Sequence, residues 1–311
     1  MRQPVPYFDA HCDTVAACAP GGASLRKNSG HLDLERLAAF SPAGQVFALY
    51  ADAARFPAGT LFAVCRQMRA YFRAELQKNA DILAFCPMGH GLREAAAAGR
   101  IAAVLSIEGG ELLNCDPALL ETAAQWGVRC ITLTWNHANA LAGAHADAPD
   151  RGLSPRGRAW VRECRRLGIL PDVSHLSDAA FWDIAELAEG PILASHSNSR
   201  AICPHSRNLT DDMFRAICQS GGAVGLNFWL DFVGGDHSMD ALIRHIDHFM
   251  ELGGEKHLAL GGDMDGCSAL AGGLRGAEDI PLLWAALQDR GYAEATLEDI
   301  FYNNLLRVLG G

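Results

Sequence analysis

The sequence lacks any uninterrupted apolar segment of about 18 residues, which is the length that a transmembrane helix needs. Residues 1–14 contain no basic stretch followed by an apolar run, so no signal peptide is predicted. Residues 303–311 offer neither a hydrophobic tail nor a CaaX box. We therefore expect a chain without a membrane anchor and a cytoplasmic location.

Positive charge is also scarce. The chain carries 26 Lys and Arg against 36 Asp and Glu, a formal net charge of −10. This balance argues against nucleic acid or an anionic membrane as the main partner. Half of the 311 residues are hydrophobic and a fifth are charged, which predicts a packed core. The length suits one α/β barrel, so we expect a single domain over residues 1–311.

The ten cysteines include no CxxC pair and are scattered from Cys12 to Cys267. Disulfides in a secreted protein are one interpretation of so many cysteines. Without a signal peptide, reduced and buried thiols in a cytoplasmic protein are the favoured one.

No glycine-rich phosphate loop follows an early strand, which argues against an open, doubly wound sheet. Helix-like segments instead separate most of a series of short apolar runs, the pattern of parallel strands with crossover helices. Eight such units predict a closed (β/α)8 TIM barrel. The expected strands lie around Tyr7–Asp9, Gln45–Tyr50, Ile101–Ile107, Cys130–Trp135, Ile169–Ser174, Ile192–Ser195, Ala223–Phe228 and Leu258–Gly262. The expected helices include Gly59–Phe85, Pro117–Trp126, Ser154–Leu167, Asp178–Ala188, Asp211–Gln219, Ser238–Leu252 and Thr296–Leu309.

The segment Ala138–Pro155 is long, small and polar, and follows the fourth expected strand. We interpret it as a functional loop over the barrel mouth rather than a domain boundary.

Candidate metal ligands stand at the ends of the first and third strands. His11 and Asp13 are two residues apart, so on a strand both side chains project to one face. Imidazole and carboxylate together suit zinc or a similar divalent ion, although His-x-Asp alone is a common pair. Glu108 ends the third strand before two glycines and is placed to bridge two cations. The alternative for Glu108 is a carboxylate favoured by a helix N-terminus.

Two histidines end the fifth and sixth strands. His175 and His196 are 21 residues apart, about one βα unit, and should face the same mouth as the first three candidates. A single histidine of this kind is often a structural residue, but two on adjacent strands are hard to explain that way. We therefore predict that these five side chains bind two metal ions and share Glu108.

Asp263 follows the eighth strand, at the place where barrel hydrolases carry an acid–base carboxylate. The alternative is an ordinary turn rich in Asp and Gly. Asp265 is a second candidate for the same role.

Several segments resemble the membrane dipeptidase (renal dipeptidase) family of binuclear zinc peptidases. The similarity runs from about residue 7 to residue 310, in the family's order. It rests on DAHCDT, GHLDLERL…GQVFALYAD, IEGGE, DVSH, SHSNSRAICPHSRNLTDD and GGDMDG.

The resemblance implies a (β/α)8 TIM barrel of the metal-dependent hydrolase type, which holds two zinc ions and forms a homodimer. By position, His11 and Asp13 would bind one zinc and His175 and His196 the other, with Glu108 shared. Arg207 matches the arginine that holds the substrate's carboxylate, for which a guanidinium fork is suited; a surface salt bridge is the alternative. Asp263 matches an aspartate that handles protons and the substrate amine.

The fourth strand departs from the family. The substrate-polarising histidine that follows Thr-Leu-Thr is replaced by Trp135, with Asn136 and His137 behind it. We expect Trp135, Asn136 and His137 to contact the substrate, and His137 to stabilise the oxyanion. His145 is a further candidate for that task.

The sequence thus predicts a zinc dipeptidase that cleaves small dipeptides with a metal-bridged hydroxide, including dipeptides with a D-residue on the C-terminal side. The alternative enzyme is a binuclear metal hydrolase of another small amide, a β-lactam or a lactone. A barrel that binds a small ligand without catalysis is the alternative from another class.

Overall fold

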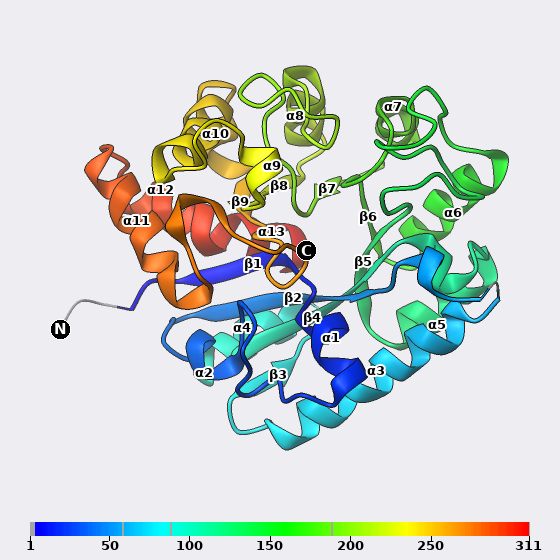
Figure 1. The fold of residues 1–311 in the computed structure, drawn as a ribbon, viewed down its shortest axis with the longest axis horizontal. Helices are drawn as coiled ribbons and strands as arrows, with labels where there is room; N and C mark the ends of the chain where they lie inside the picture. The colour runs from blue at the N-terminus through cyan, green and yellow to red at the C-terminus, as the bar shows by residue number, and fades with distance from the viewer. Residues whose placement is uncertain (1–3, 58, 88, 188, 311) are drawn as a thin grey trace.

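A closed ring of parallel strands forms the centre of the molecule (Figure 1). The structure, a computed structural model, describes residues 4–57, 59–87, 89–187 and 189–310. β2 pairs with β1 and with β4, and β1 also pairs with β9, so the ring has no free edge. The predicted (β/α)8 barrel is confirmed. Its eight strands are β1 (Tyr7–Cys12), β2 (Ala43–Tyr50), β4 (Ile101–Glu108), β5 (Val128–Thr132), β6 (Leu170–Asp172), β7 (Leu193–Ala194), β8 (Ala223–Leu226) and β9 (Leu258–Leu260).

The segment Gly59–Phe85, expected as one helix, forms a helix followed by a short strand, so the prediction is wrong for its last residues. The helix α3 covers Leu61–Lys78 and is capped by Asn79, after which β3 (Leu83–Phe85) is extended. β3 pairs in parallel with the first residues of β4, on the edge that β5 uses further along. The strand lies outside the ring and lengthens the sheet only at its base.

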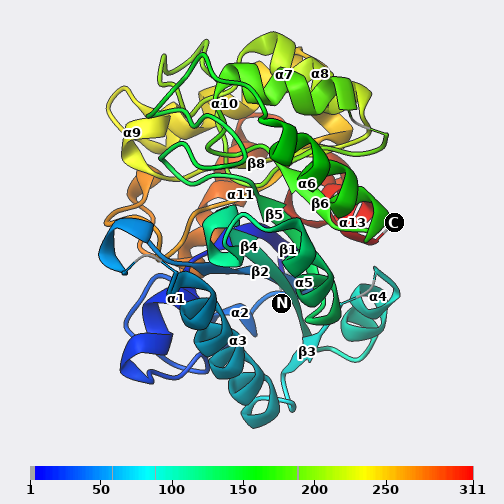
Figure 2. The same cartoon turned by 90° about the vertical axis from the view of Figure 1, so that its right-hand side faces the viewer.

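Helices surround the ring on its outside (Figures 1 and 2). Their starts agree with local capping chemistry: the hydroxyls of Ser154, Thr210 and Ser238 each accept a hydrogen bond from the backbone N–H three residues on. Beside α3, the helices are α1 (Thr14–Cys18), α2 (Leu34–Leu37), α4 (Gly89–Ala97), α5 (Leu120–Gln125), α6 (Pro155–Arg166), α7 (Asp178–Leu187), α8 (Asp211–Gln219), α9 (Leu230–Val233), α10 (Met239–Glu251), α11 (Ile280–Asp289), α12 (Glu294–Glu298) and α13 (Asn304–Gly310).

Two of the expected helices differ in their bounds from the observed ones. The expected helix Asp178–Ala188 is α7, but Ala188 lies outside the described residues. The expected helix over Thr296–Leu309 is α12 and α13, joined by a π-helical turn over 299–303.

The inside of the ring is apolar at its base and polar at its mouth. On β4, Ala102 and Val104 face the interior cluster, and Ser106 and Glu108 follow on the same face two and four residues later. α13 closes the base, where its Leu305 and Leu309 pack against this cluster. On β4, the alternation thus places the polar side chains of this face at the carboxyl end of the strand.

All ten cysteines are free thiols, and eight of them are buried. Among the described residues, no helix has both the length and the apolar character required to cross a membrane.

Candidate metal centre and substrate cavity

Three histidines and three carboxylates meet inside the barrel mouth. The two oxygens of Glu108 face different partners: Oε2 lies 3.4 Å from His11 Nε2, and Oε1 lies 2.9 Å from His175 Nε2 and 3.6 Å from His196 Nε2. Asp13 Oδ2 lies 3.5 Å from His11 Nε2. The structure therefore brings the five predicted ligands together, with Glu108 between the His11–Asp13 pair and the His175–His196 pair.

A β-bulge in β1 helps to aim the first pair. The pairing of β1 with β2 shifts register between Asp9 and Cys12, and Cys12 packs into the outer core. His11 and Asp13 consequently point together into the mouth, as bulges next to functional sites commonly arrange. The carboxylate of Asp9 holds the bulge, because it accepts hydrogen bonds from the backbone N–H groups of His11 (2.9 Å) and Gly262 (2.8 Å).

Hydrogen bonds at the outer ring nitrogens orient the other two histidines. His175 Nδ1–H donates to Asn136 Oδ1 at 2.8 Å, and His196 Nδ1 shares a hydrogen bond of 2.7 Å with Ser195 Oγ. Both Nε2 atoms are thereby turned into the cluster, where they lie 2.9 Å apart. An outer-shell partner of this kind is typical of metal-binding histidines.

The donor set fits metal ions on a further observation. His11 Nε2 and Asp13 Oδ1 are buried polar atoms without a hydrogen-bond partner in the described part of the chain. Such atoms are costly unless something else satisfies them. His11, Glu108 and His196, and separately His11, Asp13 and Asp263, also present ligand atoms within 4.8 Å of one another.

Burial dominates the electrostatics of the cluster. It raises the pKa of Glu108 to about 7 and lowers the pKa values of His175 and His196 well below their ordinary range. Burial also disfavours the protonated form of His11, but the Glu108 and Asp13 carboxylates outweigh that effect and raise its pKa. His175 and His196 are thus kept in the neutral form, which is the form that binds metal.

The two candidate aspartates after β9 point to different places. Asp263 Oδ1 lies 3.9 Å from His11 Nε2, while its Oδ2 accepts a hydrogen bond of 3.1 Å from Asn227 Nδ2. Asp265 instead accepts hydrogen bonds from Thr14 Oγ1 and the backbone N–H of His31, both at 2.5 Å. Asp263 is therefore the aspartate that faces the cluster. Asp265 joins the loop after β9 to the first residue of α1 and to the loop that contains His31.

Arg207 lies in the loop after β7 and is 3% exposed. Its guanidinium donates to Ser197 Oγ at 3.2 Å and to the carbonyl oxygen of His196 at 3.1 Å, and it packs 5.3 Å from the Phe232 ring centre. Within the described residues it has no carboxylate at ion-pair distance, and its Nε has no partner. Burial lowers its pKa to about 10. An unpaired, buried guanidinium favours an anionic ligand.

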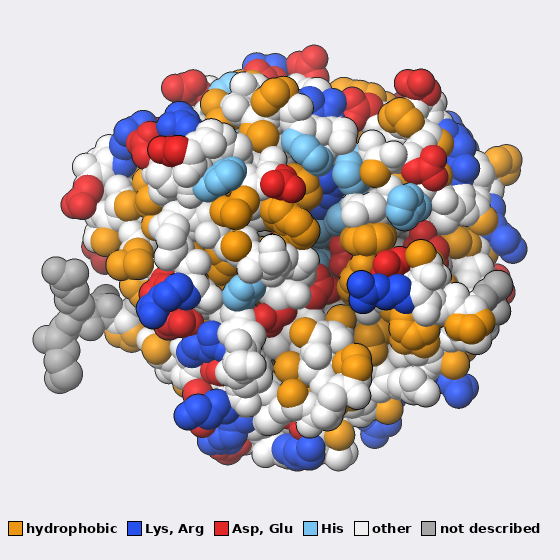
Figure 3. Space-filling model, viewed as in Figure 1, with side chains coloured by type: hydrophobic (Ala, Val, Ile, Leu, Met, Phe, Trp, Pro, Cys, Tyr) orange, Lys and Arg blue, Asp and Glu red, His pale blue; other side chains and the backbone are white. Residues whose placement is uncertain are grey.

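A cavity of about 290 Å³ opens above the cluster. Figure 3 shows acidic and histidine side chains gathered around a hollow on this face. Phe232, which packs on Arg207, is part of the wall. The lining residues are Asp13, Tyr50, Glu108, Trp135, Asn136, His145, His175, His205, Trp229, Asp231, Phe232, Asp263 and Gly266.

The residues after β5 are divided between the cavity and the solvent. Trp135 and Asn136 line the cavity as predicted, whereas His137 is exposed and is not part of its lining. His145, from the predicted loop Ala138–Pro155, lines the cavity instead and bonds to Asn136 Oδ1 at 2.8 Å. The position of His137 thus gives no support to its predicted contact with substrate.

Several residues of the site were not singled out from the sequence, Tyr50 and Asn227 among them. Tyr50 is the last residue of β2 and lines the cavity, and Asn227 follows β8 and holds Asp263. Both are polar residues at the carboxyl end of a barrel strand. That position is the signal that indicates a role in the site.

Comparisons with known proteins agree with this geometry. The family model for membrane dipeptidase (peptidase family M19) matches residues 1–311. The Klebsiella pneumoniae protein called "Uncharacterized protein in pqqA 5'region" is 34% identical over 255 residues, which cover 78% of this chain and 94% of that protein.

Solved structures are similar over nearly the whole length. A metallopeptidase from Rhodobacter sphaeroides, liganded with a phosphinate mimic of the dipeptide L-Ala-D-Ala, is 27% identical with a TM-score of 0.92, and 99% of each chain is covered. The dipeptidase AC, a metallopeptidase of family M19, is 29% identical with a TM-score of 0.91 and covers 99% of this chain and 100% of its own. The chain therefore belongs to the membrane dipeptidase family, peptidase family M19, and is a metallo-dipeptidase, a hydrolase of peptide bonds.

Proposed function

We propose that this chain is a binuclear zinc dipeptidase that cleaves small dipeptides with a free C-terminal carboxylate, including those with a D-residue on that side. The observation that carries the proposal is the position of Glu108, whose two carboxylate oxygens face two separate groups of ligands. The similarity to a metallopeptidase that binds a mimic of L-Ala-D-Ala supports the substrate class.

Five side chains would hold the two ions. His11 and Asp13 would bind one, His175 and His196 the other, and Glu108 would bind both. A pair of divalent ions lowers the pKa of a water molecule and polarises a carbonyl oxygen. Imidazole nitrogens and carboxylate oxygens form a donor set that zinc accepts readily.

Asp263 would move the proton of the reaction. Its Oδ2 is engaged by Asn227 Nδ2, so Oδ1, which faces His11, is the atom left to take a proton from water and to return it to the leaving amine. The hydrogen bond from Asn227 would keep the carboxylate in one orientation during both proton transfers.

Arg207 would bind the C-terminal carboxylate of the substrate. Its guanidinium has the planar fork that a carboxylate matches with two hydrogen bonds. Holding this end fixes the scissile amide over the ligand cluster, which lowers the entropic part of the barrier.

Asn136 would take the place of the family's polarising histidine. Its Oδ1 accepts hydrogen bonds from His175 Nδ1 and His145 Nε2, both at 2.8 Å. The amide Nδ2 remains as an N–H donor on the cavity wall. An N–H donor beside the reacting carbonyl stabilises the developing oxyanion.

A substrate panel tests the proposal. L-Ala-D-Ala, L-Ala-L-Ala, the amide of L-Ala-D-Ala, a β-lactam and a lactone would be compared on the zinc-loaded enzyme. We expect both free dipeptides to be cleaved, and the amide to lose most of its kcat/KM because Arg207 has no carboxylate to bind. Preferred cleavage of the lactone or β-lactam, or equal cleavage of the amide, would overturn the proposal.

A further inference from the structure

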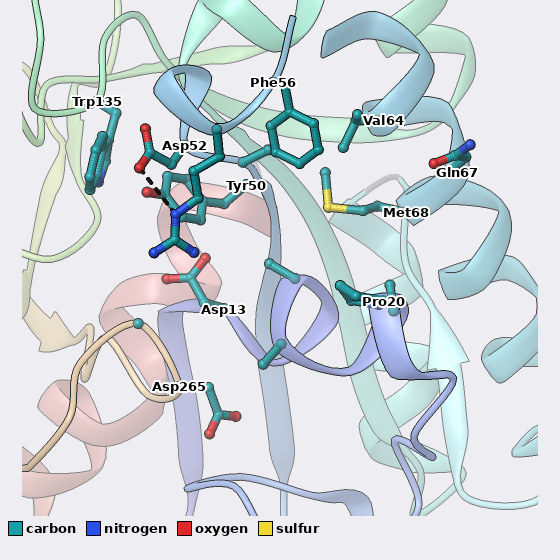
Figure 4. A pocket seen from close by; sticks show the side chains of 16 residues that line it. Asp13, Pro20, Tyr50, Asp52, Phe56, Val64, Gln67, Met68, Trp135 and Asp265 are labelled. Carbon is teal, nitrogen blue, oxygen red and sulfur yellow. Dashed lines mark ion pairs between the residues drawn. The ribbon is translucent and has the colours of Figure 1, made fainter. Parts of the chain in front are cut away.

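A second and larger cavity opens beside the first. It has a volume of about 610 Å³ and lies between the loops after β1 and β2 and the helix α3 (Figure 4). The two cavities share Asp13, Tyr50, Trp135 and Gly266 in their walls. The second cavity is therefore a continuation of the candidate substrate site rather than a separate depression.

Small and apolar side chains form most of its wall. α1 and the turn after it contribute alanines, and Val64 and Met68 lie one turn apart on α3 (Figure 4). Because α1 presents alanines here, the space between α1 and α3 stays open. The apolar wall consists of Ala16, Ala17, Ala19, Pro20, Ala51, Phe56, Val64 and Met68.

Apart from Asp13, a proposed metal ligand, the charged groups of this cavity have partners within the chain. Asp52 Oδ2 pairs with Arg55 Nε at 3.6 Å, the ion pair dashed in Figure 4, and Asp52 also caps the backbone N–H of Ala54. Asp265 is held by Thr14 and by the backbone of His31. The carboxylates outnumber Arg55, so an acidic ligand would be repelled. The lining suits an uncharged, apolar group.

The position of the cavity identifies the end of the substrate that would enter it. Arg207 lies in the loop after β7, next to Phe232 in α9, the helix that follows β8. The second cavity lies across the mouth, next to β1 and β2, with the ligand cluster between them. A dipeptide whose carboxylate is at Arg207 and whose amide lies over Glu108 directs its amino-terminal residue toward this cavity.

We propose that the second cavity binds the side chain of the substrate's amino-terminal residue and selects large apolar side chains such as Leu, Met or Phe. The inference rests on the proposed function. A volume of about 610 Å³ falls within the roughly 300–1,000 Å³ of small-molecule sites. A methyl side chain would leave most of this apolar wall in contact with water. A Leu or Phe side chain would cover part of the wall and remove itself from water, which favours its binding.

The wild-type zinc enzyme provides the first test, with dipeptides X-D-Ala in which X is Ala, Leu, Phe, Glu or Lys. We expect kcat/KM for Leu and Phe to exceed that for Ala by about ten- to a hundredfold, as the burial of a whole apolar side chain implies. A preference for Ala, Glu or Lys would overturn the inference while leaving dipeptide hydrolysis intact. Failure to cleave any member of the panel would overturn the proposed function as well.

Variants that fill the cavity provide the second test. Ala16→Phe on α1 and Val64→Phe on α3 each add a ring to the wall, and Ala63→Phe adds the same ring to the adjacent, exposed position outside it. The readout is the ratio of kcat/KM for Phe-D-Ala to that for Ala-D-Ala, which is insensitive to the fraction of active protein. We expect this ratio to fall about tenfold or more in a filled variant and to stay at the wild-type value in Ala63→Phe. An unchanged ratio in the filled variants would overturn the inference.

Discussion

Replacing Arg207 by Met should weaken substrate binding without lowering the stability of the fold. Met keeps most of the apolar volume of the side chain but removes the guanidinium. Among the described residues, the hydrogen-bond partners of the guanidinium are Ser197 Oγ and the His196 carbonyl oxygen. If the guanidinium binds the substrate's carboxylate, the variant loses two charge-assisted hydrogen bonds of about 1.5–3 kcal/mol each. The expected consequence is an increase of about a hundredfold or more in KM for dipeptides.

The same substitution should not destabilise the fold. A pKa of about 10 means that the folded protein disfavours the charged guanidinium by roughly 3 kcal/mol. The two hydrogen bonds that Met cannot make contribute about 1.5 kcal/mol each, the low end for a charged donor. The two effects nearly cancel, so the free energy of unfolding of Arg207→Met should lie within about 1 kcal/mol of that of the wild type.

Steady-state kinetics and urea unfolding of both proteins measure the two effects. Arg215→Met is the matched control, because Arg215 is an exposed arginine on α8 with one ion pair, to Asp212 at 2.9 Å. It should change neither KM nor the free energy of unfolding by more than about 1 kcal/mol. A KM within threefold of wild type, together with a loss of several kcal/mol of stability in Arg207→Met, would make Arg207 a structural residue and refute the reasoning.

Three further predictions concern the site and its support. Asp263→Asn should retain the wild-type metal content but lose about 10²–10⁴-fold in kcat, since the amide cannot accept the proton; kcat within threefold of wild type would remove its role. Gly266→Ala places a Cβ against the carboxylate oxygens of Asp13 and Asp263, so metal affinity and kcat should both fall. The control is Gly21→Ala, where a Cβ meets nothing within 4 Å, and it should keep the metal affinity and kcat of the wild type. Wild-type metal affinity and kcat in Gly266→Ala would contradict the geometry. Burial lowers the pKa of His245 to about 4, and its neutral ring bridges two backbone groups. Its contribution to stability is thus complete above about pH 6.5 and lost as pH falls toward 4, by about 3 kcal/mol in total. As pH falls from 7 to 4, the urea midpoint should fall less steeply in His245→Gln than in the wild type. Equal slopes would show that His245 does not cause this loss of stability.

The features that follow from strand periodicity were predictable from the sequence. Glu108, His175 and His196 each follow an apolar strand, and parallel strands bring their carboxyl ends to one mouth. His11 and Asp13 were expected to share a face, and they do so next to a bulge in β1 that the sequence pattern alone does not reveal.

Other features depend on contacts distant in sequence. β3 is a strand because β4 offers it an unpaired edge, whereas its own three residues continue the apolar pattern of α3. His137 and His145 were equivalent candidates near the mouth. The return of the loop toward Ser206, which bonds to His145 Nδ1 at 3.0 Å, is what carries His145 into the cavity. Similarly, the two aspartates are distinguished by their partners, which are Thr14 and His31 for Asp265 and Asn227 for Asp263.

The number of metal ions per chain tests the central claim most directly. Purified protein would be analysed for metal by mass spectrometry, and its hydrolysis of L-Ala-D-Ala would be followed before chelation, after chelation and after zinc is restored. The account predicts about two zinc ions per chain, loss of activity with the chelator and recovery with zinc. One ion or none in an active enzyme, or activity that survives complete chelation, would contradict it.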